Sequence, residues 1–476
     1  MMHAANLING QERQGEEALA VYNPSRYDHV IGTIPRSSAA DVADAVAAAD
    51  QARTIWRNAG AMARGNALFS AARIIEAHRD ELAILAATEM GKPIGEARGE
   101  ALRAAAILRY YAGEGARSVG EVIPAGNPKT LQYTTRDPVG VIAVITPWNF
   151  PLAIPMWKIA PALAYGNTVV IKPAELASLS AYQMLALILS CFPEGVLNVV
   201  IGRGREAGEA LIRHPRVDAI TFTGSSAVGS HIAEVAASRG VKYQLEMGGK
   251  NPVIVAEDAD LASAVELTVS GAMRSAGQKC TATSRVIVMS SVHSVFRDAL
   301  VERVRQLKTG DPLDAETYLG PVVSASQKES VMSFVEDAKR SGGRLLIGGN
   351  LPDLPGHFVL PTIFDDVSAD APIAQEEVFG PVVAIVSAAS LDEAIAVANS
   401  VRYGLSASVF TKSLSTALEV VDRLDAGMVG VNEETAGVEY QAPFGGKKES
   451  SSHSREQGRA AIEFFTETKT VAIRSV

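Results

Sequence analysis

The chain has 476 residues, of which 47% are hydrophobic and 20% charged, and its formal net charge is −9. This balance is typical of a globular protein with enough apolar material for two or three domains. An acidic chain without a basic block is a poor nucleic-acid partner. Because Pro, Gly or a charge interrupts every apolar stretch within about 18 residues, we also expect no membrane span.

Targeting and cysteine content indicate the compartment. The first residues show no positive segment followed by an apolar one, so no signal peptide is expected. The two cysteines are too few for a disulfide framework. We therefore expect reduced thiols and a cytoplasmic protein.

The predicted elements change character along the chain. Residues 39–112 have apolar positions at helical spacing and predict several amphipathic helices. Short β-branched runs then alternate with helical stretches, which indicates βαβ units and a parallel sheet; these runs are residues 139–146, 167–171, 197–201 and 219–222. A second alternation starts at 252–255 and extends to about residue 432, with helices expected at 294–306 and 327–340. Residues 118–137 and 464–476 are β-prone and of mixed polarity, and would suit strand exchange between subunits.

Cys280 stands in the polar turn Gly277-Gln278-Lys279-Cys280-Thr281. A lone cysteine is more often buried filling than a nucleophile. Here, however, the neighbouring Lys279 would favour the thiolate, which is the reactive form. Cys191 ends an apolar helical stretch and is expected to be structural.

Two further side chains could serve the same chemistry. Glu246 follows a probable strand and precedes a Gly-Gly turn, between Leu245 and Met247. Partial burial there would raise its pKa and make it a general base near neutral pH, although most glutamates are solvated. Asn149 lies in a proline-bounded loop, where asparagine usually serves the backbone, yet its amide is also a suitable oxyanion donor.

Two glycine-containing turns compete for a dinucleotide. Residues 202–208 fit the G-x-G-x-x-A pattern between a strand and a helix, but no ribose-binding acid follows about 20 residues later. Residues 222–229 also join a strand to a helix, and their serines and helix N-terminus would suit a diphosphate. The pattern alone does not decide between the two turns.

Taken together, seven ordered motifs resemble those of the aldehyde dehydrogenase superfamily over nearly the whole chain: residues 146–151, 172–175, 222–229, 246–250, 277–280, 376–381 and 443–446. The resemblance implies an α/β fold with two Rossmann-like domains and a small β oligomerisation arm. Residues 1–118 and 142–246 would bind the cofactor, 247–458 would form the catalytic domain, and 119–141 with 459–476 would form the arm. A homodimer or homotetramer is implied.

The resemblance also implies residue roles. Cys280 would be the nucleophile and Glu246 the base, Asn149 would stabilise the oxyanion, and Lys158 with Glu467 would form a proton path. NAD, or less readily NADP, would bind without any metal to Ile145, Thr146, Pro147, Trp148, Lys172, Glu175, Gly204, Gly208, Thr223, Gly224, Ser225, Glu377 and Phe379. Glu175 would accept hydrogen bonds from the ribose and repel a 2′-phosphate, which favours NAD.

The substrate is indicated less directly. Residues 450–458 are one residue longer than the usual family ending and lack its glycines, which is similar to a bacterial branch that oxidises α-ketoglutarate semialdehyde (2,5-dioxopentanoate). The distal carboxylate of a semialdehyde needs a cation or several donors. Lys279 is one candidate, although it could instead activate the thiol or pair with Glu439, and Arg455 or His453 could approach. The expected substrate-binding residues are Phe150, Trp157, Lys279, Thr281, Val438, Tyr440, Phe444 and Arg455.

Alternatives remain open. Another semialdehyde, or aldehydes in general, could be the substrate. An acyl-phosphate or acyl-CoA reductase would use the same cysteine but has no need for a hydrolytic base. A non-catalytic scaffold protein would need none of Cys280, Glu246 and Asn149.

Overall fold

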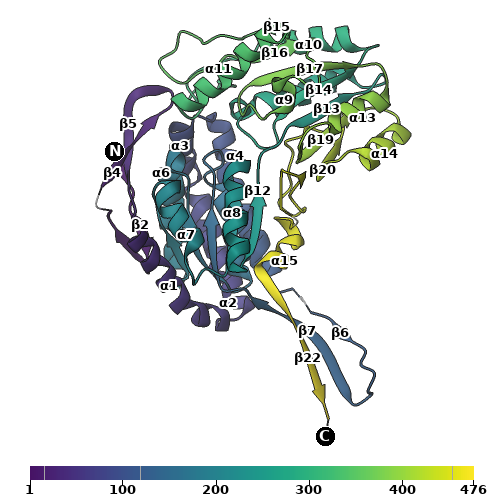
Figure 1. Ribbon diagram of the computed structural model, residues 1–476. Helices are drawn as coiled ribbons and strands as arrows, with labels where there is room; N and C mark the ends of the chain where they lie inside the picture. Colours follow the sequence, from purple (N-terminus) through teal and green to yellow (C-terminus); the bar gives the residue numbers. More distant parts are fainter. Residues whose placement is uncertain (16, 118–119, 453, 476) are drawn as a thin grey trace.

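A computed structural model describes residues 1–15, 17–117, 120–452 and 454–475. His453 and residues 118 and 119, at the predicted start of the arm, lie outside the described residues. Two seven-stranded sheets, each with helices packed on it, form the body of the molecule, and a slender β ribbon projects from it (Figure 1). This agrees with the α/β class expected from the sequence.

The first sheet has the strand order β12-β11-β8-β9-β10-β2-β3. The five strands from β12 to β10 are parallel, and β2 joins β10 in the antiparallel sense. Their bounds are β2 Asn6–Ile8, β3 Gln11–Arg13, β8 Val141–Ile145, β9 Thr168–Lys172, β10 Leu197–Val199, β11 Ala219–Thr223 and β12 Lys242–Glu246.

The central strands β8, β9, β10 and β11 are buried on both faces, which explains why they are mostly apolar. Successive side chains of β8 enter two different cores. Ile142 and Val144 pack among the helices of one face, whereas Val141 and Ala143 pack against the other. The helices of the first half are α1 Ala39–Asn58, α2 Ala61–Ala77, α3 Arg79–Met90, α4 Ile94–Glu114, α5 Ala153–Ala164, α6 Ser178–Ile188, α7 Glu209–Arg213 and α8 Ser226–Arg239.

The chain crosses to the second sheet directly after Glu246. This sheet has the order β15-β16-β17-β14-β13-β19-β20, and all its neighbours are parallel except β15 and β16. Its strands are β13 Asn251–Val255, β14 Thr283–Met289, β15 Arg344–Ile347, β16 Thr362–Asp365, β17 Val382–Ala388, β19 Ser406–Phe410 and β20 Met428–Val431. Its helices are α9 Leu261–Met273, α10 His293–Arg305, α11 Ala325–Arg340, α12 Pro372–Gln375, α13 Leu391–Asn399 and α14 Leu414–Arg423.

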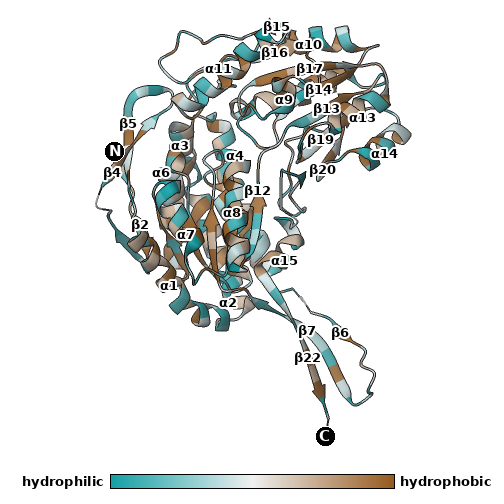
Figure 2. Ribbon diagram, in the orientation of Figure 1, coloured by the Kyte–Doolittle hydropathy of each residue, from teal (hydrophilic) through white to brown (hydrophobic). Residues whose placement is uncertain are grey.

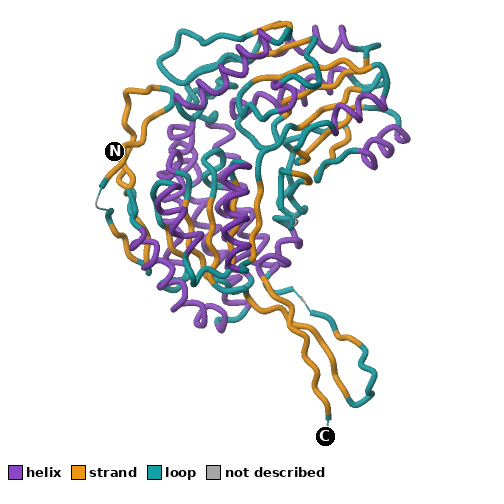
Figure 3. Tube along the Cα trace, viewed as in Figure 1, coloured by secondary structure: helices purple, strands orange, loops and turns teal. Residues whose placement is uncertain are grey.

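Smaller sheets complete the fold. β1 Met2–His3, β5 Arg26–Pro35 and β4 Ala18–Asn23 form an N-terminal sheet, which the sequence did not predict. β18 Tyr403–Gly404 pairs with β21 Lys447–Lys448. The projecting ribbon contains β22 Thr466–Arg474, β7 Thr130–Pro138 and β6 Val122–Ile123, and appears as extended strands in Figure 3.

The predicted C-terminal strand needs a correction at its start. Residues 464 and 465 belong to the short helix α15 Ala461–Phe465, and both phenylalanines are buried in the core of the first sheet. Strand β22 begins only at Thr466, where the chain leaves that core. In the part of the chain that the structure describes, no helix has the length and apolarity needed to cross a membrane.

Candidate active site

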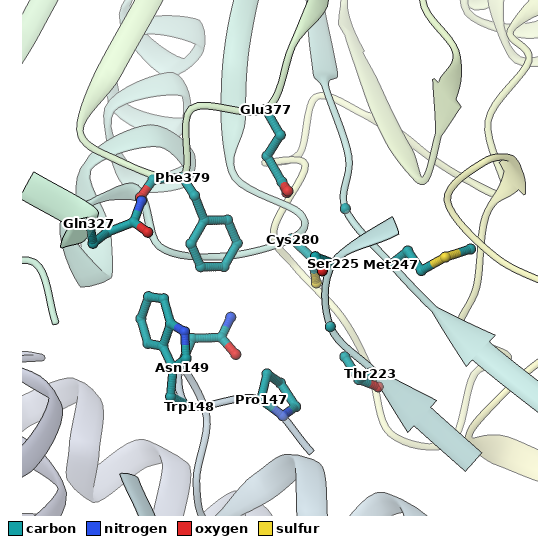
Figure 4. A pocket seen from close by; sticks show the side chains of 12 residues that line it. Pro147, Trp148, Asn149, Thr223, Ser225, Met247, Cys280, Gln327, Glu377 and Phe379 are labelled. Carbon is teal, nitrogen blue, oxygen red and sulfur yellow. The ribbon is translucent and has the colours of Figure 1, made fainter. Parts of the chain in front are cut away.

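A cavity of about 220 Å³ opens at the carboxyl ends of β8, β11 and β12. From β8 the chain continues to β9 and β10 on one side, whereas β11 and β12 lie on the other. Ligands of open parallel sheets bind at such a reversal of strand order. Figure 4 shows the cavity, which is lined by Pro147, Trp148, Asn149, Thr223, Gly224, Ser225, Met247, Gly248, Cys280, Gln327, Glu377 and Phe379.

Cys280 reaches this cavity from a strained turn. Ser275 and Ala276 have φ values of 53° and 51° in the turn η4 Arg274–Gly277. Gly277 has φ +69°, and a Cβ there would lie 2.1 Å from the carbonyl oxygen of Gly380. The turn thus needs glycine where it passes under the Glu377 segment. Strain of this kind is often retained where it positions a functional group.

The thiol of Cys280 is neutral in this environment. Burial, followed by the nearby carboxylates of Glu377 and Glu246, raises its pKa to about 12. The residue is partly exposed, because it faces the cavity. A nucleophile held as the thiol needs a base to remove its proton.

Lys279 makes a contact that serves neither of the roles considered for it. Its ammonium is directed towards the carbonyl oxygen of Ser270, at 3.4 Å, and the side chain does not line the cavity. Its nearest acidic neighbours are Glu96 and Glu434, not Glu439. Cys280 and Lys279 are consecutive in the turn, but only Cys280 lines the cavity, and the charged groups that shift the thiol pKa are Glu377 and Glu246.

Glu246 is the last residue of β12 and is buried. The Ser451 hydroxyl donates a hydrogen bond to one carboxylate oxygen, while the other oxygen has no partner among the described residues. Burial, together with the nearby Glu456 carboxylate, raises the pKa of Glu246 well above its ordinary value. Gly445 passes so close to Glu246 that a Cβ added to this glycine would lie 2.9 Å from the carboxylate oxygen that has no partner in the described part of the chain.

Behind Glu246 lies a buried ion pair. The Lys158 ammonium contacts the Glu456 carboxylate and donates a hydrogen bond of 3.0 Å to the Thr221 hydroxyl. The predicted partner of Lys158, Glu467, is exposed on β22 and lies nearer to Asp218 and Lys242. Glu456 therefore takes the place expected for Glu467. Glu456 could have been found from the sequence, because it is a carboxylate inside the unusual 450–458 segment.

Asn149 is buried beside the thiol segment. Its amide nitrogen donates to the carbonyl oxygen of Gln278, at 2.9 Å, which leaves its second N–H for another acceptor. Figure 4 shows this amide at the cavity, on the side opposite Glu377. The amide and the backbone N–H of Cys280 are both available to a developing oxyanion.

Glu377 and Phe379 close the other side of the cavity. The backbone N–H of Gly249 donates to Glu377, and a Cβ on Gly248 would lie 2.3 Å from this carboxylate. Burial raises the pKa of Glu377 to about 7. The Phe379 ring meets the Trp148 ring edge to face, with centroids 5.4 Å apart, so the two rings form one aromatic wall of the cavity.

A second cavity, of about 520 Å³, continues the same end of the sheet. Both glycine-containing turns contribute to it, so the two candidates are neighbours in space. Its wall contains Ile145, Lys172, Gly204, Arg205, Gly208, Glu209, Ile212, Ala227, Val228, His231 and Ile232. Lys172 is buried, and burial lowers its pKa to about 8. Glu175 is exposed and lines a neighbouring cavity instead, although its charge reaches Lys172.

These residues fit a dinucleotide. The buried hydroxyls of Thr146, Thr223 and Ser226 have no hydrogen-bond partner among the described residues, and the first turn of α8 lies directly after Ser225. Free hydroxyls and helix N–H groups are what a diphosphate requires. The rings of Trp148 and Phe379 lie at the Cys280 end of this site, and the 520 Å³ cavity lies at the other end.

The expected substrate residues do not line the 220 Å³ cavity, and the structure places them in separate contacts. The rings of Trp157 and Phe444 pack at 5.3 Å, and Tyr440 contacts Tyr110 at 5.9 Å. Phe150 lies under the Lys92 ammonium, 3.9 Å from the ring centroid. The carbonyl of Thr281 is bound by Thr435, and Val438 is half-buried. Arg455 packs against Gly445 beside the base.

Comparison with known proteins agrees with this geometry. The model of the aldehyde dehydrogenase family matches residues 11–471, and the chain belongs to that family. It is 50% identical to an alpha-ketoglutaric semialdehyde dehydrogenase of Bacillus subtilis (strain 168), over 98% of both chains. An alpha-ketoglutarate semialdehyde dehydrogenase of Haloferax volcanii is 44% identical, again over 98% of both chains.

Solved structures share the fold. The crystal structure of an NAD-dependent aldehyde dehydrogenase from Sinorhizobium meliloti has a TM-score of 0.97 and 36% identity, and the match covers 99% of this chain and 95% of that one. A betaine aldehyde dehydrogenase from Staphylococcus aureus, solved in complex with NAD+, has a TM-score of 0.96 and 35% identity, with the same coverage. The aldehyde dehydrogenase fold predicted from the motifs is thereby confirmed.

Proposed function

We propose that this enzyme oxidises the aldehyde group of 2,5-dioxopentanoate to a carboxylate, with NAD as cofactor. The observation that carries the chemistry is that the buried Glu246 carboxylate lies within electrostatic reach of the Cys280 thiol, which lines the cavity. The substrate is supported by the full-length relatives, which include a 2,5-dioxopentanoate dehydrogenase of Saccharolobus solfataricus, 39% identical over 96% of both chains.

The first step forms a carbon–sulfur bond. Glu246 takes the thiol proton of Cys280, and the sulfur attacks the aldehyde carbon while the carbonyl π electrons move to oxygen. The Asn149 amide and the Cys280 backbone N–H stabilise this oxyanion, and losing such a donor typically slows an enzyme about 10²–10³-fold. The bound nicotinamide would accept the hydride that leaves the same carbon, so that a thioester remains on Cys280.

The second step breaks the carbon–sulfur bond. Glu246 first passes the thiol proton on towards Glu456 and Lys158, and its carboxylate then removes a proton from water, so that the resulting hydroxide attacks the thioester carbon. The sulfur leaves as a thiolate and takes this second proton from Glu246, which restores the thiol, and the carboxylic acid is released. A buried base supports hydrolysis rather than acyl transfer to coenzyme A or phosphate, since such transfer needs no base for water.

We assign the cofactor groups by the same reasoning. Ser225 and the first turn of α8 would hold the diphosphate, while Lys172 and Glu175 would bind the adenosine ribose. Glu377 and Phe379 would position the nicotinamide end beside Cys280. The preference for NAD over NADP rests on Glu175, because its carboxylate would repel a 2′-phosphate.

The molecular context completes the proposal. We assign the cofactor-binding domain to residues 1–118 and 142–246, the catalytic domain to 247–458, and the oligomerisation arm to 119–141 and 459–476. The protein is proposed to act in the cytoplasm as a homodimer or homotetramer.

One experiment tests the activity and the cofactor together. NADH or NADPH formation is followed with 2,5-dioxopentanoate, succinic semialdehyde and pentanal, for the wild type and Cys280→Ala. We expect the highest kcat/KM with 2,5-dioxopentanoate and NAD, and no turnover by Cys280→Ala despite normal NAD binding. Steady-state oxidation by Cys280→Ala would refute the mechanism, and a wild type that prefers pentanal would refute the substrate.

A further inference from the structure

Arg103 is a half-buried guanidinium without a protein partner. It lies in the middle of α4, and within the described ranges it makes no hydrogen bond and no ion pair within 4.0 Å. Burial lowers its pKa, while Glu439 and Tyr440 lie near enough to act in the opposite direction. A partly desolvated arginine that no carboxylate contacts is costly unless something else binds it.

The position of Arg103 on its helix points it at an open space. One face of α4 carries five residues that follow one another at spacings of one to seven positions: Glu96, Gly99, Glu100, Arg103 and Tyr110. A Cβ added to Gly99 would meet nothing within 4 Å. Because a helical side chain leans over the turn preceding it, we expect the Arg103 side chain to extend over this open, exposed position.

Three contacts of the same face locate that space. Glu96 accepts hydrogen bonds from the backbone N–H and the hydroxyl of Ser275, in the turn that presents Cys280. Glu100 accepts the backbone N–H groups of Leu152 and Ala153, at the start of α5 and directly after Phe150.

The third contact is at the other end of the face, where Tyr110 packs on Tyr440 in the loop before Phe444. The thiol turn, the start of α5 and the 438–441 loop therefore surround the region between Glu96 and Tyr110. Arg103 is in its centre.

The other cations near this region are already engaged. Lys92 pairs with Glu100, Lys279 is directed to Ser270, and Arg455 lies beside the catalytic base. Glu439 is near Arg103 but does not close an ion pair with it. Arg103 thus keeps its donors available for an incoming carboxylate, and a guanidinium can bind a carboxylate through two parallel hydrogen bonds.

We propose that Arg103 binds the carboxylate of the substrate, at the end opposite the reacting aldehyde, and so selects short-chain aldehydes that carry a terminal carboxylate. This inference rests on the proposed function, because it assigns a receptor for the charge that 2,5-dioxopentanoate carries. It makes Arg103 a specificity residue that takes no part in the chemical steps at Cys280.

The test compares charged and uncharged aldehydes. Arg103→Met, Arg103→Lys and the wild type are assayed for kcat/KM with 2,5-dioxopentanoate, succinic semialdehyde and pentanal, and for competitive inhibition by glutarate. Arg98→Met is the matched control, since Arg98 lies on the same helix but donates to Asp80 at the surface. Oxidation of pentanal shows that each variant is folded and competent.

We expect Arg103→Met to lower kcat/KM for both semialdehydes about 10- to 100-fold, the value of a hydrogen bond to a charged group. Glutarate inhibition should weaken similarly, while pentanal oxidation stays within about twofold. Arg103→Lys should retain part of the preference, and Arg98→Met all of it. If the wild type prefers semialdehydes and Arg103→Met keeps that preference, the assignment of Arg103 is wrong. If the wild type shows no such preference, the proposed substrate itself is wrong.

Discussion

Burial disfavours the ionised forms of both side chains that we propose to react. Burial raises the pKa of the Cys280 thiol to about 12 and that of Glu246 well above its ordinary value. Each group therefore depends on the other, since the thiol needs a base and the base works only when ionised. Activity should rise as the pH increases through the pKa of Glu246.

The ion pair of Lys158 and Glu456 lies behind Glu246, so a change in this pair should shift the pH dependence of activity. Glu456→Gln removes a negative charge that raises the Glu246 pKa, and leaves the positive charge of Lys158 uncompensated. Both changes favour the ionised base, so its pKa falls and the acidic limb of the kcat profile moves to lower pH, by about one unit. Profiles from pH 5 to 10 measure this shift. Glu449→Gln, at an exposed carboxylate paired with Arg402, should leave the limb in place, and an alkaline shift in Glu456→Gln would contradict the coupling.

Removing the base should separate the two chemical steps. Glu246→Gln cannot activate water, so the thioester should accumulate and steady-state turnover should fall about 10²–10⁴-fold. Rapid mixing should still detect a first turnover, slower than in the wild type but with about one NADH per active site. Mass spectrometry of the quenched protein should find the acyl group on Cys280. A variant that never forms this acyl-enzyme would show that Glu246 acts only before the thioester.

Sequence reasoning could propose Cys280, Glu246 and Asn149, because they stand in ordered motifs that resemble those of one family, although each residue alone has an ordinary structural explanation. It could not find partners that are distant along the chain. Lys279 is next to Cys280 in sequence but faces Ser270, whereas Glu456 reaches Lys158 across 298 residues. Glu467 was a plausible acid by motif, but β22 carries it to the surface. The roles of these site residues stay predictions until the variants are measured.

At the scale of elements, one carboxylate joins α4 to α5. Glu100 is buried, pairs with Lys92, and accepts the free N–H groups of Leu152 and Ala153. A carboxylate at a helix N-terminus satisfies N–H groups that have no partner within the helix. The same segment carries Asn149, so the position of the proposed oxyanion donor depends on Glu100.

Glu100→Ala should therefore cost both stability and activity. It leaves the Lys92 charge buried without a partner, a loss of about 3–5 kcal/mol in similar cases. Urea unfolding measures the stability, and kcat with pentanal measures the oxyanion site without involving a substrate carboxylate. The double variant Lys92→Met with Glu100→Gln removes the stranded charge and should recover much of the stability. If the double variant is less stable than Glu100→Ala, the buried charge is not the cause.

The predicted elements agree best with the structure where burial is most complete. The central strands of the two large sheets are mostly apolar and buried, and each predicted run differs from its strand by only a few residues at the ends. The N-terminal sheet was not predicted, because its strands have mixed exposure and no clear alternation. The start of the C-terminal strand was misplaced, because Phe464 and Phe465 have strand-like composition but anchor α15 in the core.

At the scale of the whole molecule, the projecting ribbon has features that a monomer would not retain. β22 forms the edge of its sheet over nine residues and pairs with β7 from Thr466 to Arg474. Apolar side chains lie exposed along the ribbon, and Figure 2 shows hydrophobic colouring on its strands. Leu131 and Ile473, which are cross-strand partners, are 51% and 53% exposed. A long, partly apolar edge strand is a template for pairing with another chain.

Charged residues placed on this ribbon should therefore lower the number of subunits in the oligomer. Leu131→Glu combined with Ile473→Glu puts two like charges opposite each other on the proposed contact surface, where burial of either would cost several kcal/mol. Sedimentation velocity should show a species of lower mass than the wild type, with the body of the protein still folded by circular dichroism. Ile55→Glu, at an equally exposed apolar residue of α1, is the control and should sediment like the wild type. An unchanged mass for the double variant would exclude the ribbon from the subunit contact, because two buried glutamates could not be tolerated at such an interface.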